Sequence, residues 1–343
     1  MKNKKLIRKI FELCIILCIA LSSWLFSIHS KVPIPSTDTP ALFYSTDRDD
    51  HLGTLFKEAI ANAKTSIQIA IYTLTDQRIL QALRQKASLG VKVTVICDAK
   101  ACQGIEKKLG NDIHLIKSTP KGLMHLKILV IDDRLVWVGS ANMTGESLRV
   151  HGNIMTGFDS PELAVWIQKK LFSLSRGSSE YTPPNAFLIG NQTIEFWFLP
   201  NDKDAVQRIR QLIRSAKKTI QIAMFTWTRL DFVNDIVSAK LRGVDVQIVL
   251  DTNSSKGASL NVVKALQKGH VPFKVKTGPG LLHYKMMIID DSILVSGSAN
   301  WTKAAFRYNE DCYFVLSPLN LEQQSFLKEM WETINMNAKL EKL

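Results

Sequence analysis

Two stretches of the chain carry the same reactive side chains at the same spacing. Each opens with a His and a Lys two positions apart, continues to an Asp, and ends in Gly-Ser-Ala-Asn; they are His125–Asn142 and His283–Asn300. Imidazole groups titrate near neutral pH and can act as nucleophile, acid or base. Lys, Ser and Asn side chains can neutralise or hydrogen-bond the oxygens of a phosphodiester. These residue types favour phosphoryl transfer without a metal.

Strand-forming residues follow each His-x-Lys pair, so each pair is expected on a strand, where residues i and i+2 share a face. The catalytic candidates are therefore His125, Lys127, His283 and Lys285. The closing Gly-Ser-Ala-Asn suits a loop or helix start that faces a phosphate. The phosphate-binding candidates are Ser140, Asn142, Ser298 and Asn300.

The Asp of each stretch belongs to a turn between two apolar runs, which predicts a hairpin. Asp132 and Asp290 are an odd number of positions from their His, so they point to the other face of the strand. From the residues alone, we expect these two carboxylates to support the site.

The repeated pattern His-x-Lys-x4-Asp-x6-Gly-Ser-x-Asn resembles the signature of the phospholipase D superfamily, over about residues 41–337. The resemblance implies that both motifs meet at one site and counts Asp132 and Asp290 within the catalytic motif. It implies that one His attacks phosphorus to form a phosphohistidine and the other protonates the leaving alcohol. We assign His125 as nucleophile and His283 as acid, and the reverse assignment stays open.

Members of this superfamily usually carry an acidic residue about eleven positions beyond the Asn of Gly-Ser-x-Asn, where it holds the imidazole. Asp311, or its neighbour Glu310, fills this place in the second half, whereas Asn153 fills it in the first. An Asn oxygen can fix a ring N–H but stabilises imidazolium less. We therefore expect His125 to be the weaker base, or simply the less charged partner.

The whole chain reads as an internal duplication. Ser66–Tyr72 matches Thr219–Phe225, and Gly90–Asp98 matches Gly243–Asp251. The closing helices are expected to start at Ser160-Pro161 and Ser317-Pro318, each with Ser as N-cap and Pro at the first helical position. Alternating strands and helices predict an α/β fold with mixed, mostly parallel sheets. The family resemblance implies two similar α/β/α sandwich domains related by pseudo-twofold symmetry. The expected domains are 41–175 and 191–343, with linkers at 32–40 and 176–190.

The N-terminus combines a lysine-rich start with the apolar run Leu13–Ile28. This pattern is typical of a signal peptide or N-terminal membrane anchor, so residues 1–31 predict export to the cell envelope, with cleavage left open. The net charge of +13 indicates an anionic partner such as a lipid or nucleic acid.

Five cysteines give no disulfide framework. Cys97 and Cys102 are close enough in sequence to bridge in an exported protein, and whether they do is left open. No Cys/His cluster has zinc-ligand spacing, so no metal or cofactor is expected.

The predicted function is hydrolysis of the headgroup ester of phospholipids by a phospholipase D-type enzyme that works at a membrane surface. Tyr72, Phe225 and Trp227 are candidates for an apolar rim around the site, with ordinary core packing as the alternative. The alternatives for the whole chain are an endonuclease of the same superfamily, a phosphatidyltransferase of cardiolipin-synthase type, and an inactive binding module. Since both motifs lie in one chain, a monomer is expected.

Overall fold

The computed structural model describes residues 15, 32–37, 39–48, 50–175 and 185–341. Residues 1–33 and 34–343 are separate compact units. The first lies almost wholly outside the described residues, so the fold below is that of the second.

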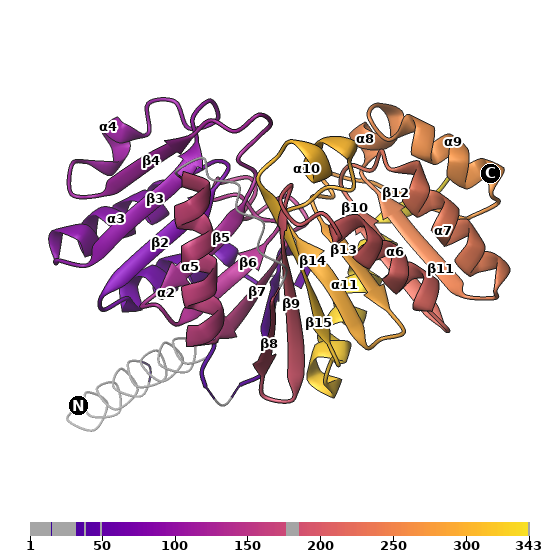
Figure 1. Cartoon of the computed structure of the whole chain (residues 1–343), viewed down its shortest axis with the longest axis horizontal. Helices are drawn as coiled ribbons and strands as arrows, with labels where there is room; N and C mark the ends of the chain where they lie inside the picture. Colours follow the sequence, from indigo (N-terminus) through magenta and orange to yellow (C-terminus); the bar gives the residue numbers. More distant parts are fainter. Residues whose placement is uncertain (1–14, 16–31, 38, 49, 176–184, 342–343) are drawn as a thin grey trace, which may run out of the picture. The chain divides into compact units, whose positions relative to one another are not determined.

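The first half builds a seven-stranded sheet in the order β1-β7-β6-β5-β2-β3-β4 (Figure 1). Its strands are β1 (Leu42–Ser45), β2 (Ser66–Ile71), β3 (Lys92–Asp98), β4 (His114–Ser118), β5 (Lys127–Ile131), β6 (Leu135–Gly139) and β7 (Ile154–Asp159). Its helices are η1 (Thr46–Arg48), α2 (Leu52–Asn62), α3 (Gln77–Ser88), α4 (Glu106–Leu109) and α5 (Pro161–Ser175).

The second half builds a nine-stranded sheet in the order β16-β12-β11-β10-β13-β14-β15-β9-β8. Its strands are β8 (Asn185–Ile189), β9 (Gln192–Leu199), β10 (Thr219–Met224), β11 (Asp245–Leu250), β12 (Lys274–Lys276), β13 (Lys285–Ile289), β14 (Ile293–Gly297), β15 (Asp311–Ser317) and β16 (Ala338–Leu340). Its helices are α6 (Ala205–Ser215), α7 (Leu230–Leu241), α8 (Thr252–Lys256), α9 (Leu260–Lys268), α10 (Lys303–Arg307) and α11 (Leu321–Met336).

The duplication predicted from the sequence recurs in the strand pairing. β2 pairs parallel with β3 and antiparallel with β5, and β10 pairs in the same way with β11 and β13. The expectation of mostly parallel sheets is wrong, because the parallel pairs among the described strands are β2–β3, β3–β4, β10–β11 and β11–β12. The hairpins β5–β6 and β13–β14 reverse the chain. The pairs β2–β5 and β5–β6 are therefore antiparallel in the first sheet, as are β10–β13 and β13–β14 in the second.

Each hairpin turns through two consecutive Asp residues in the left-handed region, with φ of 53° at Asp132 and Asp133 and of 50° and 53° at Asp290 and Asp291. Asp tolerates this region better than most residues that carry a Cβ. The predicted hairpins are therefore present, and their strands carry both His-x-Lys motifs toward the opposite end of the sheet.

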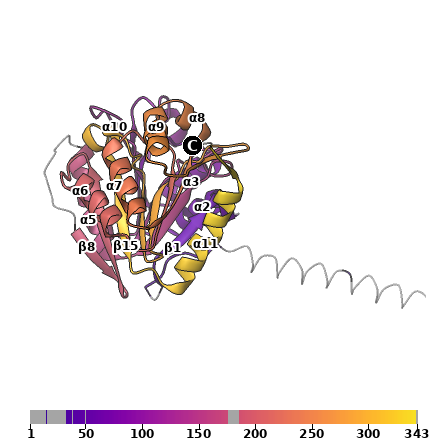
Figure 2. The same cartoon turned by 90° about the vertical axis from the view of Figure 1, so that its right-hand side faces the viewer.

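Helices cover both faces of the sheets, as Figure 2 shows: α5, α6 and α7 lie on one side and α2 and α11 on the other. Since α5 and α11 close their respective halves, this alternation is what a pseudo-twofold relation produces. Phe158 of β7 and Phe314 of β15 meet across the two sheets edge to face, with ring centroids 5.6 Å apart. Burial of large apolar side chains at this junction stabilises the arrangement.

Two predicted boundaries differ from the structure. Asn185–Ile189, placed in the linker 176–190, form β8 and pair with β9. The second closing helix does not begin at Ser317-Pro318, because β15 extends to Ser317, which pairs with Thr193. The helix begins three residues later, where Asn320 and Gln323 form a reciprocal capping box. In the first half Ser160 does cap the helix, accepting from the N–H of Leu163 at 3.3 Å.

The predicted export through an N-terminal signal or anchor is not retained. In the described part of the chain, every helix is too short or too polar to cross a bilayer; α11, with 16 residues, is amphipathic and packs against the fold. A spanning helix needs about 20 apolar residues. Residues 1–31, on which the expectation was based, lie outside the described residues except for Ile15.

Candidate active site

His125 lies two residues before β5 and is held by the other half of the chain. Its Nδ1 is 2.9 Å from Oδ1 of Asp311, at the start of β15. The backbone N–H of His125 also donates to the carbonyl of Glu310, at 2.7 Å. Because Asp311 accepts only, the ring carries its proton on Nδ1 and leaves Nε2 free.

His283 has the equivalent environment in the second half of the chain. Its Nδ1 is 2.9 Å from Oδ1 of Asn153, and its backbone N–H donates to the carbonyl of Gly152 at 2.9 Å. Both contacts come from the first half. Each motif is thus held by the loop that follows the other motif, and the two motifs meet at one centre.

This crossing corrects the pairing expected from the sequence. Asp311 serves His125 and not the His of its own half, and Asn153 serves His283. The expectation that His125 is the weaker base is therefore reversed, since the carboxylate stabilises the imidazolium of His125.

Burial dominates the titration of both rings. Desolvation, followed by the charge of Lys127, lowers the pKa of His125, while Asp311 opposes that shift. Desolvation, followed by the charges of Lys285 and Lys127, holds the pKa of His283 well below its ordinary value. The leading causes at His283 all lower its pKa, whereas Asp311 opposes the shift at His125, so the two imidazoles differ in basicity.

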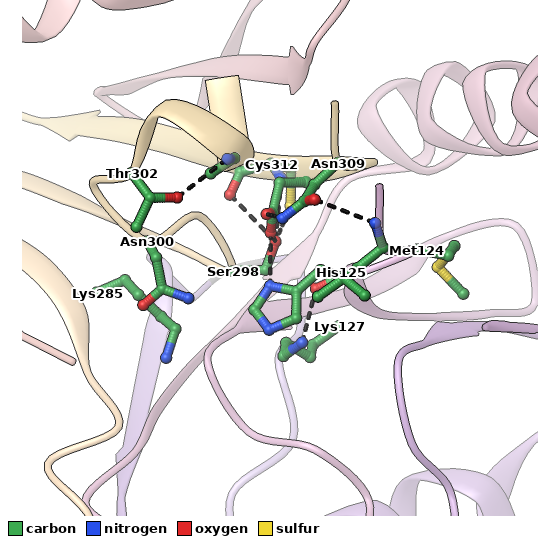
Figure 3. A network of polar contacts seen from close by, with 12 residues as sticks. Met124, His125, Lys127, Lys285, Ser298, Asn300, Thr302, Asn309 and Cys312 are labelled. Atoms are coloured by element: carbon green, nitrogen blue, oxygen red, sulfur yellow. Dashed lines mark hydrogen bonds and ion pairs between the residues drawn. The ribbon is translucent and has the colours of Figure 1, made fainter. Parts of the chain in front are cut away.

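The two lysines lie beside the rings and are almost fully buried, with 1% and 3% of Lys127 and Lys285 exposed. Each Nζ donates to the carbonyl of its own histidine, at 2.6 Å. Figure 3 draws Lys285 and Asn300 from the second half together with His125 and Lys127 from the first. Burial lowers the pKa of Lys127 to about 7, and burial together with Lys127 lowers that of Lys285 well below its usual range.

Ser140 and Ser298 were predicted to bind phosphate, but both are fully buried behind the histidines. Ser140 Oγ donates to Asn153 Oδ1 at 2.8 Å, and Ser298 Oγ donates to Asp311 Oδ1 at 2.7 Å. Their hydroxyl hydrogens are already used, so both serines orient the residues that hold the imidazoles.

Asn142 and Asn300 remain the phosphate-binding candidates of the two loops. Oδ1 of Asn300 accepts from the N–H of Thr226 at 3.2 Å, which leaves its amide N–H groups for a ligand. Oδ1 of Asn142 is buried and has no hydrogen-bond partner among the described residues. A phosphate contact by either side chain stays a prediction.

Asp132 and Asp290 lie at the far end of the motif strands. Asp132 accepts from the backbone N–H groups of residues 64–66, and Asp290 from those of residues 217–219. Backbone hydrogen bonds hold the pKa of both carboxyls below the ordinary value, against the effect of burial. Their contacts are structural, in agreement with the expectation from the residues alone and not with a direct catalytic role.

Sequence reasoning missed a second pair of carboxylates, Asp98 at the end of β3 and Asp251 directly after β11. Oδ2 of Asp98 accepts from the N–H of Met124 at 3.0 Å, and Oδ2 of Asp251 accepts from that of Leu282 at 3.0 Å. Each therefore fixes the residue that precedes a motif histidine. The signal was present, since the duplication matches these two Asp residues, but strand-end Asp residues are common.

The aromatic candidates separate into two groups. The rings of Tyr72 and Phe225 pack beside His125 and His283, with centroids 5.3 and 5.0 Å apart. Trp227 is fully buried and packs on Trp301 at 4.8 Å, so it belongs to the core and not to a rim.

Cys97, Cys102 and Cys312 are buried free thiols. Among the described residues, no group of three or more His, Cys, Asp or Glu side chains is placed to hold a metal ion. Metal-independent activity stays a prediction.

Comparison with known proteins decides the family. The profile of a family described as "Cardiolipin synthase, PLD-like domain" matches residues 56–174 and again residues 209–333. The chain belongs to the phospholipase D superfamily. Each matched segment of this phospholipase D-like chain contains one His-x-Lys motif, and the predicted family and pair of α/β/α domains are confirmed.

Two curated proteins and one solved structure are similar to this chain. Cardiolipin synthase 1 of Staphylococcus aureus (strain COL) is 24% identical over 80% of this chain and 63% of that protein. A mitochondrial cardiolipin hydrolase of Chlamydomonas reinhardtii is 31% identical over 37% of this chain and 58% of that protein. The crystal structure of phosphatidylserine synthase from Haemophilus influenzae Rd KW20 has a TM-score of 0.70 at 17% identity, over 90% of this chain and 89% of that one. The last likeness shows the fold.

The chain spans less than two thirds of the length of the two curated relatives. Synthases and hydrolases both occur among the matches. The phospholipase D-like enzyme class is therefore supported, while the choice between transfer and hydrolysis is a matter for proposal.

Proposed function

We propose that the chain transfers a phosphatidyl group from one alcohol to another by phospholipase D-type chemistry. The observation that carries the proposal is that each imidazole is hydrogen-bonded by a residue of the other half of the chain, His125 by Asp311 and His283 by Asn153. Two buried lysines lie beside the rings. Such a centre supplies a nucleophile, an acid and positive charge at one phosphate, which are the requirements of phosphoryl transfer.

The first step uses both histidines. Nε2 of His125 attacks phosphorus, the bond from phosphorus to the leaving alcohol breaks, and the alcohol oxygen takes a proton from Nε2 of His283. Lys127 and Lys285 stabilise the charge on the non-bridging oxygens. The product is a phosphatidyl group bound covalently to His125.

The second step reverses the proton movement. The hydroxyl of an acceptor attacks phosphorus, His283 takes its proton, and the bond between phosphorus and His125 breaks with the electron pair returning to the imidazole. Asp311 stabilises the imidazolium that His125 forms whenever it is protonated.

An acceptor alcohol is favoured over water for two reasons. The reacting groups are buried, with 7% of His125 and of His283 exposed, and a site that excludes bulk water protects a covalent intermediate from hydrolysis. The relative that matches 80% of the chain is named a cardiolipin synthase. Transfer therefore replaces the headgroup hydrolysis that the sequence first suggested.

Product analysis of the purified full chain tests this function. Incubated with vesicles of labelled phosphatidylglycerol in the presence of a chelator, it should release glycerol and form a lipid with two phosphatidyl groups. His125→Ala serves as the inactive control. Phosphatidic acid as the main product would return the enzyme to hydrolysis, and cleavage of DNA or RNA with every vesicle lipid untouched would make it a nuclease.

A further inference from the structure

The two imidazoles have partners of the same shape and different charge. Asn153 and Asp311 occupy equivalent places, each receives a serine hydroxyl, and each holds the Nδ1 of the opposite motif. Asp311 brings a negative charge to His125, whereas Asn153 brings only a dipole to His283.

The surroundings of Asn153 are suited to an amide. Its Nδ2 lies 2.9 Å from the carbonyl oxygen of Ser147 and 3.2 Å from that of His151. Carbonyl oxygens only accept, so the nitrogen must face them, and Oδ1 must face His283 and Ser140. In Asp311 the atom that corresponds to Nδ2 of Asn153 is an oxygen, Oδ2, and it accepts a hydrogen bond from Nδ2 of Asn309 at 3.3 Å.

A carboxylate in this place would fix the tautomer of the ring and also stabilise its imidazolium, whereas the amide of Asn153 does only the first. Oδ1 of Asn153 accepts from Nδ1–H of His283, so the ring has the productive tautomer with Nε2 free. The amide gives almost no stabilisation to the imidazolium, which forms when His283 removes a proton from the acceptor. Lys285 and Lys127 oppose that protonation further, and the hydrogen bond of Nδ1 is made to an amide, not to a carboxylate.

We propose that Asn153 is a positioning residue that makes His283 a weak base, so that attack by the acceptor limits turnover and the covalent adduct on His125 accumulates. This inference rests on the proposed function. It follows that the enzyme favours acidic, tightly bound alcohols over water in the second step, because these need the least help from a base.

An activated substrate separates the two steps. With a phosphodiester whose leaving group is p-nitrophenolate, the first step needs no acid, whereas the second still needs His283 as base. The full chain should release a burst of about one p-nitrophenolate per site, followed by a slower steady rate. Adding trifluoroethanol should raise the steady rate more than adding ethanol, and neither should change the burst rate.

Substitutions at the two equivalent places provide the matched pair. Asn153→Asp should raise the steady rate and shrink the burst, with the burst rate unchanged and the pH dependence of the steady phase displaced upward. Asp311→Asn should slow the burst itself. Because a carboxylate at 153 faces two carbonyl oxygens, thermal melting must accompany the kinetics, and the alcohol series on the unaltered chain gives the answer even where this variant unfolds.

Release of p-nitrophenolate without a burst, or a steady rate indifferent to the acidity of the acceptor, would overturn the inference and leave the proposed function standing. A chain that releases no p-nitrophenolate and leaves phosphatidylglycerol intact would overturn both.

Discussion

The side chains that hold the histidines differ by one charge, and this difference bears on the roles that we propose for the two rings. A nucleophilic imidazole becomes cationic when its Nε2 bonds to phosphorus while Nδ1 keeps its proton, so His125 benefits from Asp311, 2.9 Å away. His283 transfers protons next to a neutral amide. The crossing therefore supports His125 as nucleophile, the assignment first made from the family resemblance.

Removing each imidazole should have a different effect. His125→Ala should lower turnover by about three orders of magnitude or more with any substrate, since this variant lacks the imidazole that we propose as nucleophile. His283→Ala should lose comparable activity with alcohol leaving groups but keep the initial release of p-nitrophenolate, which needs no acid. Rapid-quench kinetics distinguish the variants, and the reverse pattern would exchange the two roles.

The buried lysines predict how phosphate binding depends on pH. The pKa of Lys127 is lowered to about 7 mainly by burial, so the empty site loses this positive charge as the pH rises through that value. The affinity for dimethyl phosphate, a phosphodiester that keeps one charge throughout this range, should fall between pH 6 and pH 8, and binding near pH 7 should take up protons. Calorimetry in buffers of different ionisation enthalpy measures both. Affinity that is constant over this range would show that Lys127 stays charged.

Sequence reasoning found the reactive residues but not how they are held. His125, Lys127, His283 and Lys285 were evident because the same spacing occurs twice. The partner of each imidazole was not, since spacing within one copy does not show which copy faces which. The contacts of Ser140 and Ser298 with the residues behind the imidazoles depend on that same crossing.

At the scale of elements, each motif strand is fixed at both ends by buried or half-buried carboxylates. Asp98 holds the residue before His125 and also caps the turn after β3, accepting from the N–H groups of Lys100 and Ala101. Asp132 holds the loop before β2 at the other end of β5. Runs of strand-forming residues predicted these strands well, whereas the strand ends depend on such long-range contacts. Ser317 therefore continues a strand where a helix cap was expected.

Substitution of these two carboxylates should distinguish an effect on the position of the nucleophile from an effect on stability. Asp98→Ala and Asp132→Ala both leave backbone N–H groups without acceptors, which costs about 1–3 kcal/mol for each buried group, so both variants should melt at lower temperature. Only Asp98→Ala should also reduce kcat, because it frees the residue next to the nucleophile. Equal kcat in the two folded variants would deny Asp98 a positioning role.

At the scale of the whole molecule, a buried carboxylate beyond β9 makes stability depend on pH. Burial raises the pKa of Asp202 to about 6, although its Oδ2 accepts from the N–H of Phe198 at 2.6 Å. The folded state therefore binds this proton more tightly than the unfolded chain does. The resulting stabilisation is complete at pH values below the unfolded pKa and is lost as the pH rises through about 6.

Replacing this carboxylate should remove that dependence. The melting temperature of Asp202→Asn relative to the unaltered chain should increase from pH 4.5 to pH 7.5, whatever the constant cost of the new amide. Scanning calorimetry at several pH values measures the difference. A difference that stays level across this range would mean that Asp202 does not titrate within it.

The crossed pairing also has a genetic consequence. Asp311 supports a histidine that lies 186 residues upstream, so a lesion in the second copy is expressed as a defect of the first. Two full-length alleles, one damaged at His125 and the other at Asp311, fail at the same imidazole although they map to different copies. Alleles damaged at His283 and Asn153 form a second such pair. Each copy needs a residue of the other, so neither copy is functional without the other.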